Sequence, residues 1–136
     1  MSSQAVRKTD SLLAMESPGF SPERPIDFVH LSRQTLGDRD LEVELLGLFE
    51  RQAAQIMERL AASGPDGDRR WRRDLAHTLK GSACAIGAGR VAETADIYEA
   101  ALFAPTTDTA LADMLADMGR AVEQARAFAR EFLAEA

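Results

Sequence analysis

Cysteine, histidine and aromatic residues are scarce in this chain of 136 residues, and each shortage excludes a class of site. The single cysteine, Cys84, cannot form an intramolecular disulfide, and it fits a reducing compartment. The two histidines, His30 and His77, belong to no H-x-x-x-H or E-x-x-H pair, so we expect no metal site. Aromatic residues make up 6% of the chain, strand-forming patterns are almost absent, and the abundant alanine favours closely packed helices.

Long apolar runs and glycine-rich phosphate loops are also missing. The apolar cluster at residues 12–15 is too short for a signal-peptide core or a membrane span, so a cytoplasmic protein is expected. Neither G-x-x-x-x-G-K-S/T nor G-x-G-x-x-G occurs, which predicts no cofactor and no ATP site in this chain. The net charge of −6 disfavours a nucleic-acid-binding protein.

The chain does contain a series of amphipathic segments. Residues 1–24 are rich in serine, proline and charge and predict a disordered tail, whereas residues 25–136 predict one helical domain. We expect a short helix over 28–36, capped by Asp27 and stopped by Gly37, then a helix over 38–62. Three further helices are expected. The first runs from about residue 68, capped by Asp66 or Asp68, to Gly87 as its C-cap, the second runs from there to Pro105, and the third, capped by Asp108 or Thr107, runs nearly to the C-terminus. Their short connections predict an all-α, antiparallel up-and-down four-helix bundle with the short helix at one end.

Each long segment carries an expected core stripe at helical spacing. The stripes are Leu41, Leu45, Leu48, Gln52, Ile56 and Leu60 with Phe49; Trp71, Leu75, Leu79, Ser82 and Ile86; Val91, Ala95, Tyr98 and Leu102; and Leu111, Leu115, Met118, Val122, Ala125, Phe128 and Phe132.

His77 is the candidate reactive residue because it falls on the opposite face of its helix. At about 100° per residue, it points about 160° away from Leu75 and therefore toward solvent. Gly81, one turn later, costs about 1 kcal/mol relative to alanine in a helix interior, so we interpret it as clearing space beside the imidazole. Lys80 lies about 60° round the helix from His77, where its ammonium can meet an anion carried on the ring. A neutral imidazole in this setting can attack phosphorus.

These residues resemble a known signature. The run from Ala76 to Ser82, followed by Ile86, Gly87 and Ala88, is similar to the motif of histidine-containing phosphotransfer (HPt) domains of two-component phosphorelays. In that family lysine, glycine, serine and a second glycine follow the histidine at +3, +4, +5 and +10, and all four are present here. The resemblance implies that His77 takes a phosphoryl group from a receiver aspartyl phosphate and passes it to another receiver aspartate. It also implies that Lys80 steadies the phosphoryl oxygens and that Gly81 admits the partner.

The same resemblance implies partners and excludes roles. The partners would be response-regulator receiver domains, which would supply Mg²⁺, together with a hybrid histidine kinase; neither nucleic acid nor membrane is expected. The chain would be a monomeric carrier and not an enzyme. The alternative is an unphosphorylated helical adaptor that binds receiver or kinase domains. The sequence fixes neither the cognate partners nor the tautomer of His77.

Several residues near the motif keep two interpretations. Ser82 either supports the site or is a small packing residue that bonds to a carbonyl one turn earlier. Arg70 and Arg73, from the run Arg69-Arg70-Trp71-Arg72-Arg73, either attract the acidic pocket of a partner or form a solvated face paired with the nearby aspartates Asp66, Asp68 and Asp74. The set Val43, Leu46, Ala53 and Met57 either forms a docking patch or, as we favour, widens the core.

Overall fold

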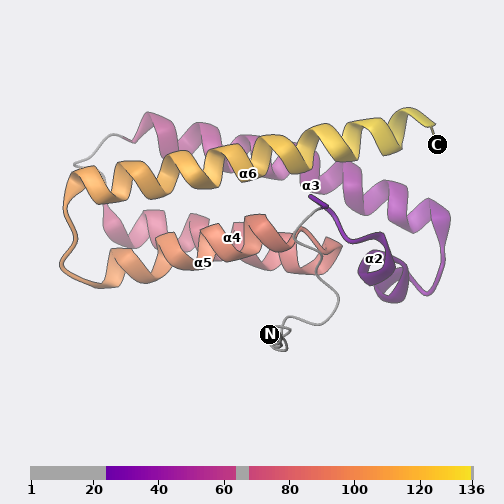
Figure 1. The fold of residues 1–136 in the computed structure, drawn as a ribbon, viewed down its shortest axis with the longest axis horizontal. Coiled ribbons are helices and arrows are strands. Elements are labelled where there is room, and N and C mark those ends of the chain that lie inside the picture. Colours follow the sequence, from indigo (N-terminus) through magenta and orange to yellow (C-terminus); the bar gives the residue numbers. More distant parts are fainter. Residues whose placement is uncertain (1–23, 64–67, 136) are drawn as a thin grey trace, which may run out of the picture.

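The computed structural model describes residues 24–63 and 68–135. These residues form five helices and no strand: α2 (Phe28–Thr35), α3 (Arg39–Ala62), α4 (Arg69–Ile86), α5 (Gly89–Phe103) and α6 (Asp108–Glu135). In Figure 1 the four long helices run side by side, and α2 lies at one end. Among the described residues α3 and α5 each pack against both α4 and α6, which gives a four-cornered bundle. The predicted all-α bundle is confirmed, and the tail predicted for 1–24 falls outside the described residues except for Arg24.

Side-chain caps begin most of the helices where the sequence predicted them. An oxygen of the capping side chain accepts a hydrogen bond from a backbone amide of the first turn, which satisfies a donor that the helix itself leaves unpaired. The capping residues are Asp27, Asp38, Asp68 and Thr107. The other cap considered for α4, Asp66, lies outside the described residues. No side chain caps α5, which follows α4 almost without a break.

Gly87 is the tight connection that fixes how α4 meets α5 and α2. It adopts a left-handed φ of 83°, as a helix C-cap, and its carbonyl accepts a hydrogen bond of 2.9 Å from the backbone of Asp27. A Cβ at this position would lie 2.8 Å from the Asp27 carbonyl oxygen. Only glycine fits here, so the C-cap prediction is confirmed. The α2 stop differs slightly, because Leu36 (φ 56°) is the first left-handed residue, one position before Gly37.

The predicted core stripes hold for α4, α5 and α6, whereas in α3 only Phe49, Ile56 and Leu60 of the predicted stripe are buried. The buried α3 residues are Leu46, Phe49, Ala53, Ile56 and Leu60, whereas Leu41 lies at the surface and Leu48 is 50% exposed. The predicted α3 stripe is wrong at Leu41 and Leu48, because α3 carries leucines on more than one face and its two neighbours decide which face is covered. Leu46 and Ala53 are core residues and therefore no docking patch; Val43 and Met57 are half-buried.

Candidate functional site

His77 lies on the outer side of α4 with 70% of its side chain exposed. Leu75 and Leu79, two residues to either side, are buried in the core and hold the helix in this orientation. The prediction from the helical pattern that His77 faces solvent is therefore confirmed. An exposed imidazole is accessible to the side chain of a second protein.

One ring nitrogen of His77 contacts a carboxylate of the neighbouring helix. The Nδ1 atom lies 3.1 Å from the Oε2 atom of Glu99 on α5, and the Glu99 side chain is only 18% exposed. Because a carboxylate can only accept, Nδ1 is the nitrogen that carries the proton in this contact. The Nε2 atom then holds the lone pair. Sequence reasoning missed Glu99.

Lys80 is held by a second carboxylate on α5, one turn before Glu99. Its Nζ atom lies 2.8 Å from Oδ1 of Asp96. The hydrogen bond that Lys80 donates to Asp96 and the negative charge of Asp96 raise the pKa of Lys80, and the charge of Glu99 adds to the effect. The ammonium stays protonated at neutral pH, one turn along α4 from the imidazole.

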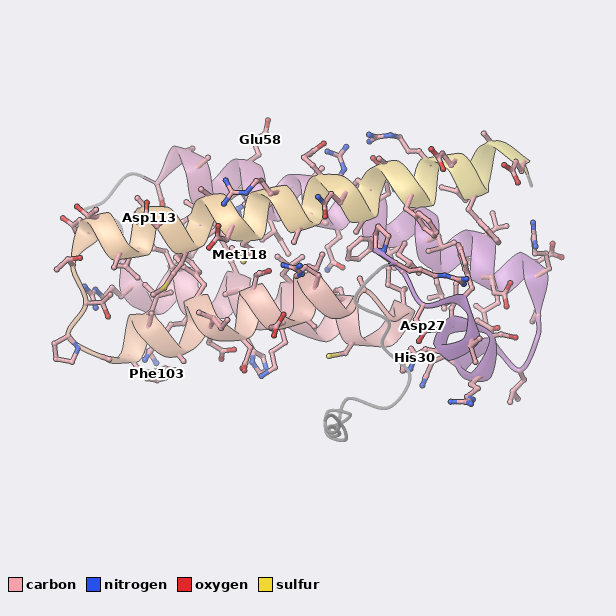
Figure 2. The ribbon with its side chains drawn as sticks, in the orientation of Figure 1. Asp27, His30, Glu58, Phe103, Asp113 and Met118 are labelled. Carbon is pink, nitrogen blue, oxygen red and sulfur yellow. The ribbon has the colours of Figure 1, made fainter. Side chains whose placement is uncertain are left out.

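A third contact completes a regular seam between α4 and α5. The guanidinium carbon of Arg73 lies 4.1 Å from the ring centre of Phe103. We call the three pairs Arg73–Phe103, His77–Glu99 and Lys80–Asp96 the α4–α5 seam. Figure 1 shows the two helices alongside each other, and Figure 2 shows Phe103 near the end of α5, at the other end of the bundle from Asp27 and His30.

Gly81 and Ser82, which follow Lys80 on α4, have different surroundings: Gly81 borders open space, and Ser82 contacts another helix. Gly81 is exposed, and a Cβ built on it would meet nothing within 4 Å, so packing does not require glycine there. The Ser82 hydroxyl donates a 2.6 Å hydrogen bond to Oε1 of Gln52 on α3. The expected bond from Ser82 to a carbonyl one turn earlier is therefore wrong, and its hydroxyl joins α4 to α3.

The arginine run has structural partners that the sequence did not predict. Arg69 donates to the carbonyls of Ala104 and Thr106, and the buried Arg72 donates to the Tyr98 hydroxyl. Within residues 68–135 no arginine of the run forms an ion pair with Asp68 or Asp74, and Asp66, the third aspartate considered, lies outside the described residues. Arg70 is exposed.

The described part of the chain contains neither a metal-binding cluster nor a membrane-spanning helix. No group of three or more histidine, cysteine, aspartate or glutamate side chains there could hold a metal ion. No helix within residues 24–63 and 68–135 has the length and apolarity needed to cross a bilayer.

Comparisons with known proteins give one family and one solved structure. The family profile described as the Hpt domain matches residues 44–131. An X-ray structure of a rice protein, provisionally named as a histidine-containing phosphotransfer protein, is 25% identical. It superposes with a TM-score of 0.69, and the match covers 89% of each chain. No curated protein matches the chain.

Proposed function

The chain belongs to the Hpt domain family, and from this premise we propose that His77 is the phosphoryl acceptor of a phosphorelay between receiver domains. Family membership and the match to the rice protein support a phosphotransfer role in two-component signalling. In the proposed relay His77 accepts a phosphoryl group from the aspartyl phosphate of one receiver and passes it to the aspartate of another.

The observation that carries this proposal is the orientation of the imidazole. With Nδ1 donating to Glu99, the Nε2 lone pair is free to attack the phosphorus of an acyl phosphate. The N–P bond forms as the P–O bond breaks, and the receiver carboxylate leaves with the electron pair. Nδ1 keeps its proton, and the positive charge that develops on the ring faces the Glu99 carboxylate. The protonated ring is the better leaving group when the phosphoryl group moves on.

The neighbouring residues take supporting roles in this proposal. Lys80 supplies a cation for the phosphoryl oxygens, and Gly81 leaves room for the aspartate of the partner. Ser82 acts indirectly, since its bond to Gln52 fixes α4 against α3. Arg70 and Arg73 would attract the acidic pocket of a receiver.

The proposal also specifies the partners and the limits of this chain's chemistry. Receiver domains would contribute the Mg²⁺ and most of the transition-state stabilisation, and a hybrid histidine kinase would supply the first phosphoryl group. This chain would be a carrier without an ATP site, acting as a cytoplasmic monomer. Neither a nucleic acid nor a membrane takes part.

Transfer from phosphorylated receivers tests the proposed function. The purified chain and the His77→Gln variant are each mixed, in Mg²⁺, with radiolabelled phosphorylated receivers from the same cell. We expect acid-labile, base-stable label on the wild type and none on the variant. If no receiver transfers label while several bind both chains equally, the chain is an unphosphorylated adaptor.

A further inference from the structure

In the α4–α5 seam the ammonium of Lys80 lies one turn after His77, and it already has an anionic partner, Asp96. Lys80 and Asp96 form an ion pair of 2.8 Å, and their side chains are 35% and 61% exposed. An ion pair this exposed is weak and can open, because water competes for both groups. Lys80 can therefore turn toward a new anion, but only by leaving Asp96.

Phosphorylation would put a stronger anion within reach of the same ammonium. His77 and Lys80 are three residues apart, about 4.5 Å along the axis of α4. A phosphoryl group carries about two negative charges at neutral pH, and it would lie near both seam carboxylates, Asp96 and Glu99. One ammonium would then serve both Asp96 and the phosphoryl oxygens.

We propose that Asp96 is a positioning residue that competes with the phosphoryl group for Lys80. Asp96 pairs with Lys80 in the unphosphorylated chain and repels the phosphoryl group in the phosphorylated chain. It therefore lowers the affinity of His77 for the phosphoryl group. The equilibrium of the relay is thereby shifted toward the receiver. This inference rests on the proposed function, because it concerns the phosphorylated state of His77.

Arg73 does not remove the competition. Its guanidinium lies on the other side of His77 along α4, and in the seam it stacks on Phe103. The remaining seam group, Glu99, is an anion that contacts the ring nitrogen. Lys80 is thus the cation whose partner changes, and Asp96 is the group that it leaves.

A partition experiment measures this competition directly. Wild-type chain labelled with ¹⁵N and unlabelled Asp96→Asn chain are mixed in equal amounts with Mg²⁺ and a trace of one phosphorylated receiver that transfers to both. The receiver donates its phosphoryl group and then catalyses exchange of that group between the two chains, so the final ratio reports the relative affinity of the two chains for the phosphoryl group. Intact mass spectrometry separates the two chains and their phosphorylated forms.

We expect the phosphoryl group to favour Asp96→Asn roughly two- to fivefold, the range of an exposed ion pair. Asp96→Glu, which keeps the charge, should return the ratio toward one. Asp113→Asn, the same change on α6 outside the seam, should leave it at one. An even partition between wild type and Asp96→Asn would overturn the inference while leaving the proposed function intact.

A second pair of variants separates competition for Lys80 from simple repulsion. In the Lys80→Gln background the added effect of Asp96→Asn should shrink, because the ammonium is gone. An undiminished effect there would contradict the role of Lys80. If no chain becomes phosphorylated, wild type included, the result would instead count against the proposed function itself.

Discussion

At the scale of single residues, Glu99 decides which nitrogen of His77 is the nucleophile. Its Oε2 atom accepts from Nδ1, while its other oxygen is buried and has no hydrogen-bond partner in the described structure. A mostly buried carboxylate with an unsatisfied oxygen carries a desolvation penalty and does not stabilise the fold. We therefore attribute the position of Glu99 to His77 and not to the core.

Replacing Glu99 by valine should separate these roles. The imidazole would lose its acceptor, so we expect the Nδ1–H tautomer to lose its dominance and transfer to slow about tenfold, which corresponds to about 1.4 kcal/mol. The midpoint of thermal unfolding should stay close to that of the wild type. The ¹⁵N shifts of the ring report the tautomer, and an unchanged tautomer would remove Glu99 from the mechanism.

Gly81 offers a residue at which stability and function should change in opposite directions. A Cβ at this exposed helical position meets nothing within 4 Å, so Gly81→Ala should stabilise the fold by about 0.5–1 kcal/mol. The added methyl group would still obstruct an approaching receiver, so transfer should slow. Urea unfolding and transfer rates measure the two effects. A variant that is more stable and equally fast would show that Gly81 clears no space for the partner.

The pairs of the α4–α5 seam can be predicted from the sequence only if the register of α4 against α5 is known. The three pairs are 73 with 103, 77 with 99 and 80 with 96, and both members of each pair lie equally far from Ala88. Helical periodicity gives the face of His77 but not which residue of another helix lies opposite. The tight turn at Gly87 sets that register.

At the scale of elements, α3 shows what periodicity alone cannot decide. A helix with apolar residues on several faces has more than one possible core stripe, and the packing of α4 and α6 selects the one centred on Leu46 and Ala53. The α4 and α6 stripes were predictable because the large apolar residues of each helix lie on one face. The α5 stripe is also buried, although Ile97 and Phe103 lie exposed outside it.

The α3–α6 pair is also joined by a charge cluster with a testable pH dependence. Glu50 on α3 accepts from Arg126 and Arg130 on α6. The hydrogen bond from Arg126, together with Arg130 and both positive charges, holds the pKa of Glu50 below its usual value. A carboxyl group with a lowered pKa stabilises the fold above its unfolded-state pKa, and this contribution is lost as the pH falls through the folded-state pKa.

We therefore expect Glu50→Gln to lower the free energy of unfolding by about 1 kcal/mol at pH 7. The difference from wild type should vanish in acid, below the folded-state pKa of Glu50. Glu58→Gln on the same helix, which removes an exposed carboxylate, is the matched control. Urea titrations across the acidic range give both curves, and a difference that persisted at low pH would exclude the ionised carboxylate as its cause.

At the scale of the whole molecule, the arginine run places positive charge beside the site on a chain with a net charge of −6. Arg73→Glu should slow transfer several-fold at low salt and reduce its salt dependence, because attraction to an acidic receiver pocket is screened by ions. Arg120→Glu, on a helix that does not pack against α4, is the control. Unchanged transfer at low salt would leave Arg73 with only its contact to Phe103.

The sequence motif alone was enough to predict the family, because it consists of His77 and of residues that follow it on α4, up to the C-cap Gly87. The bundle followed from the spacing of apolar residues and the capping side chains. What could not be predicted were contacts between helices: Glu99 with His77, Asp96 with Lys80, and Ser82 with Gln52. Each depends on the relative rotation of two helices, which a pattern within one helix does not contain.

The atom that carries the phosphoryl group is the most direct test of this account. After transfer from a phosphorylated receiver, ¹⁵N–³¹P coupling in the ¹⁵N-labelled chain identifies the nitrogen bonded to phosphorus. We predict one N–P bond, at Nε2 of His77, with Nδ1 still protonated. A bond at Nδ1, at His30, or at no histidine in a chain that has accepted label would contradict the central claim.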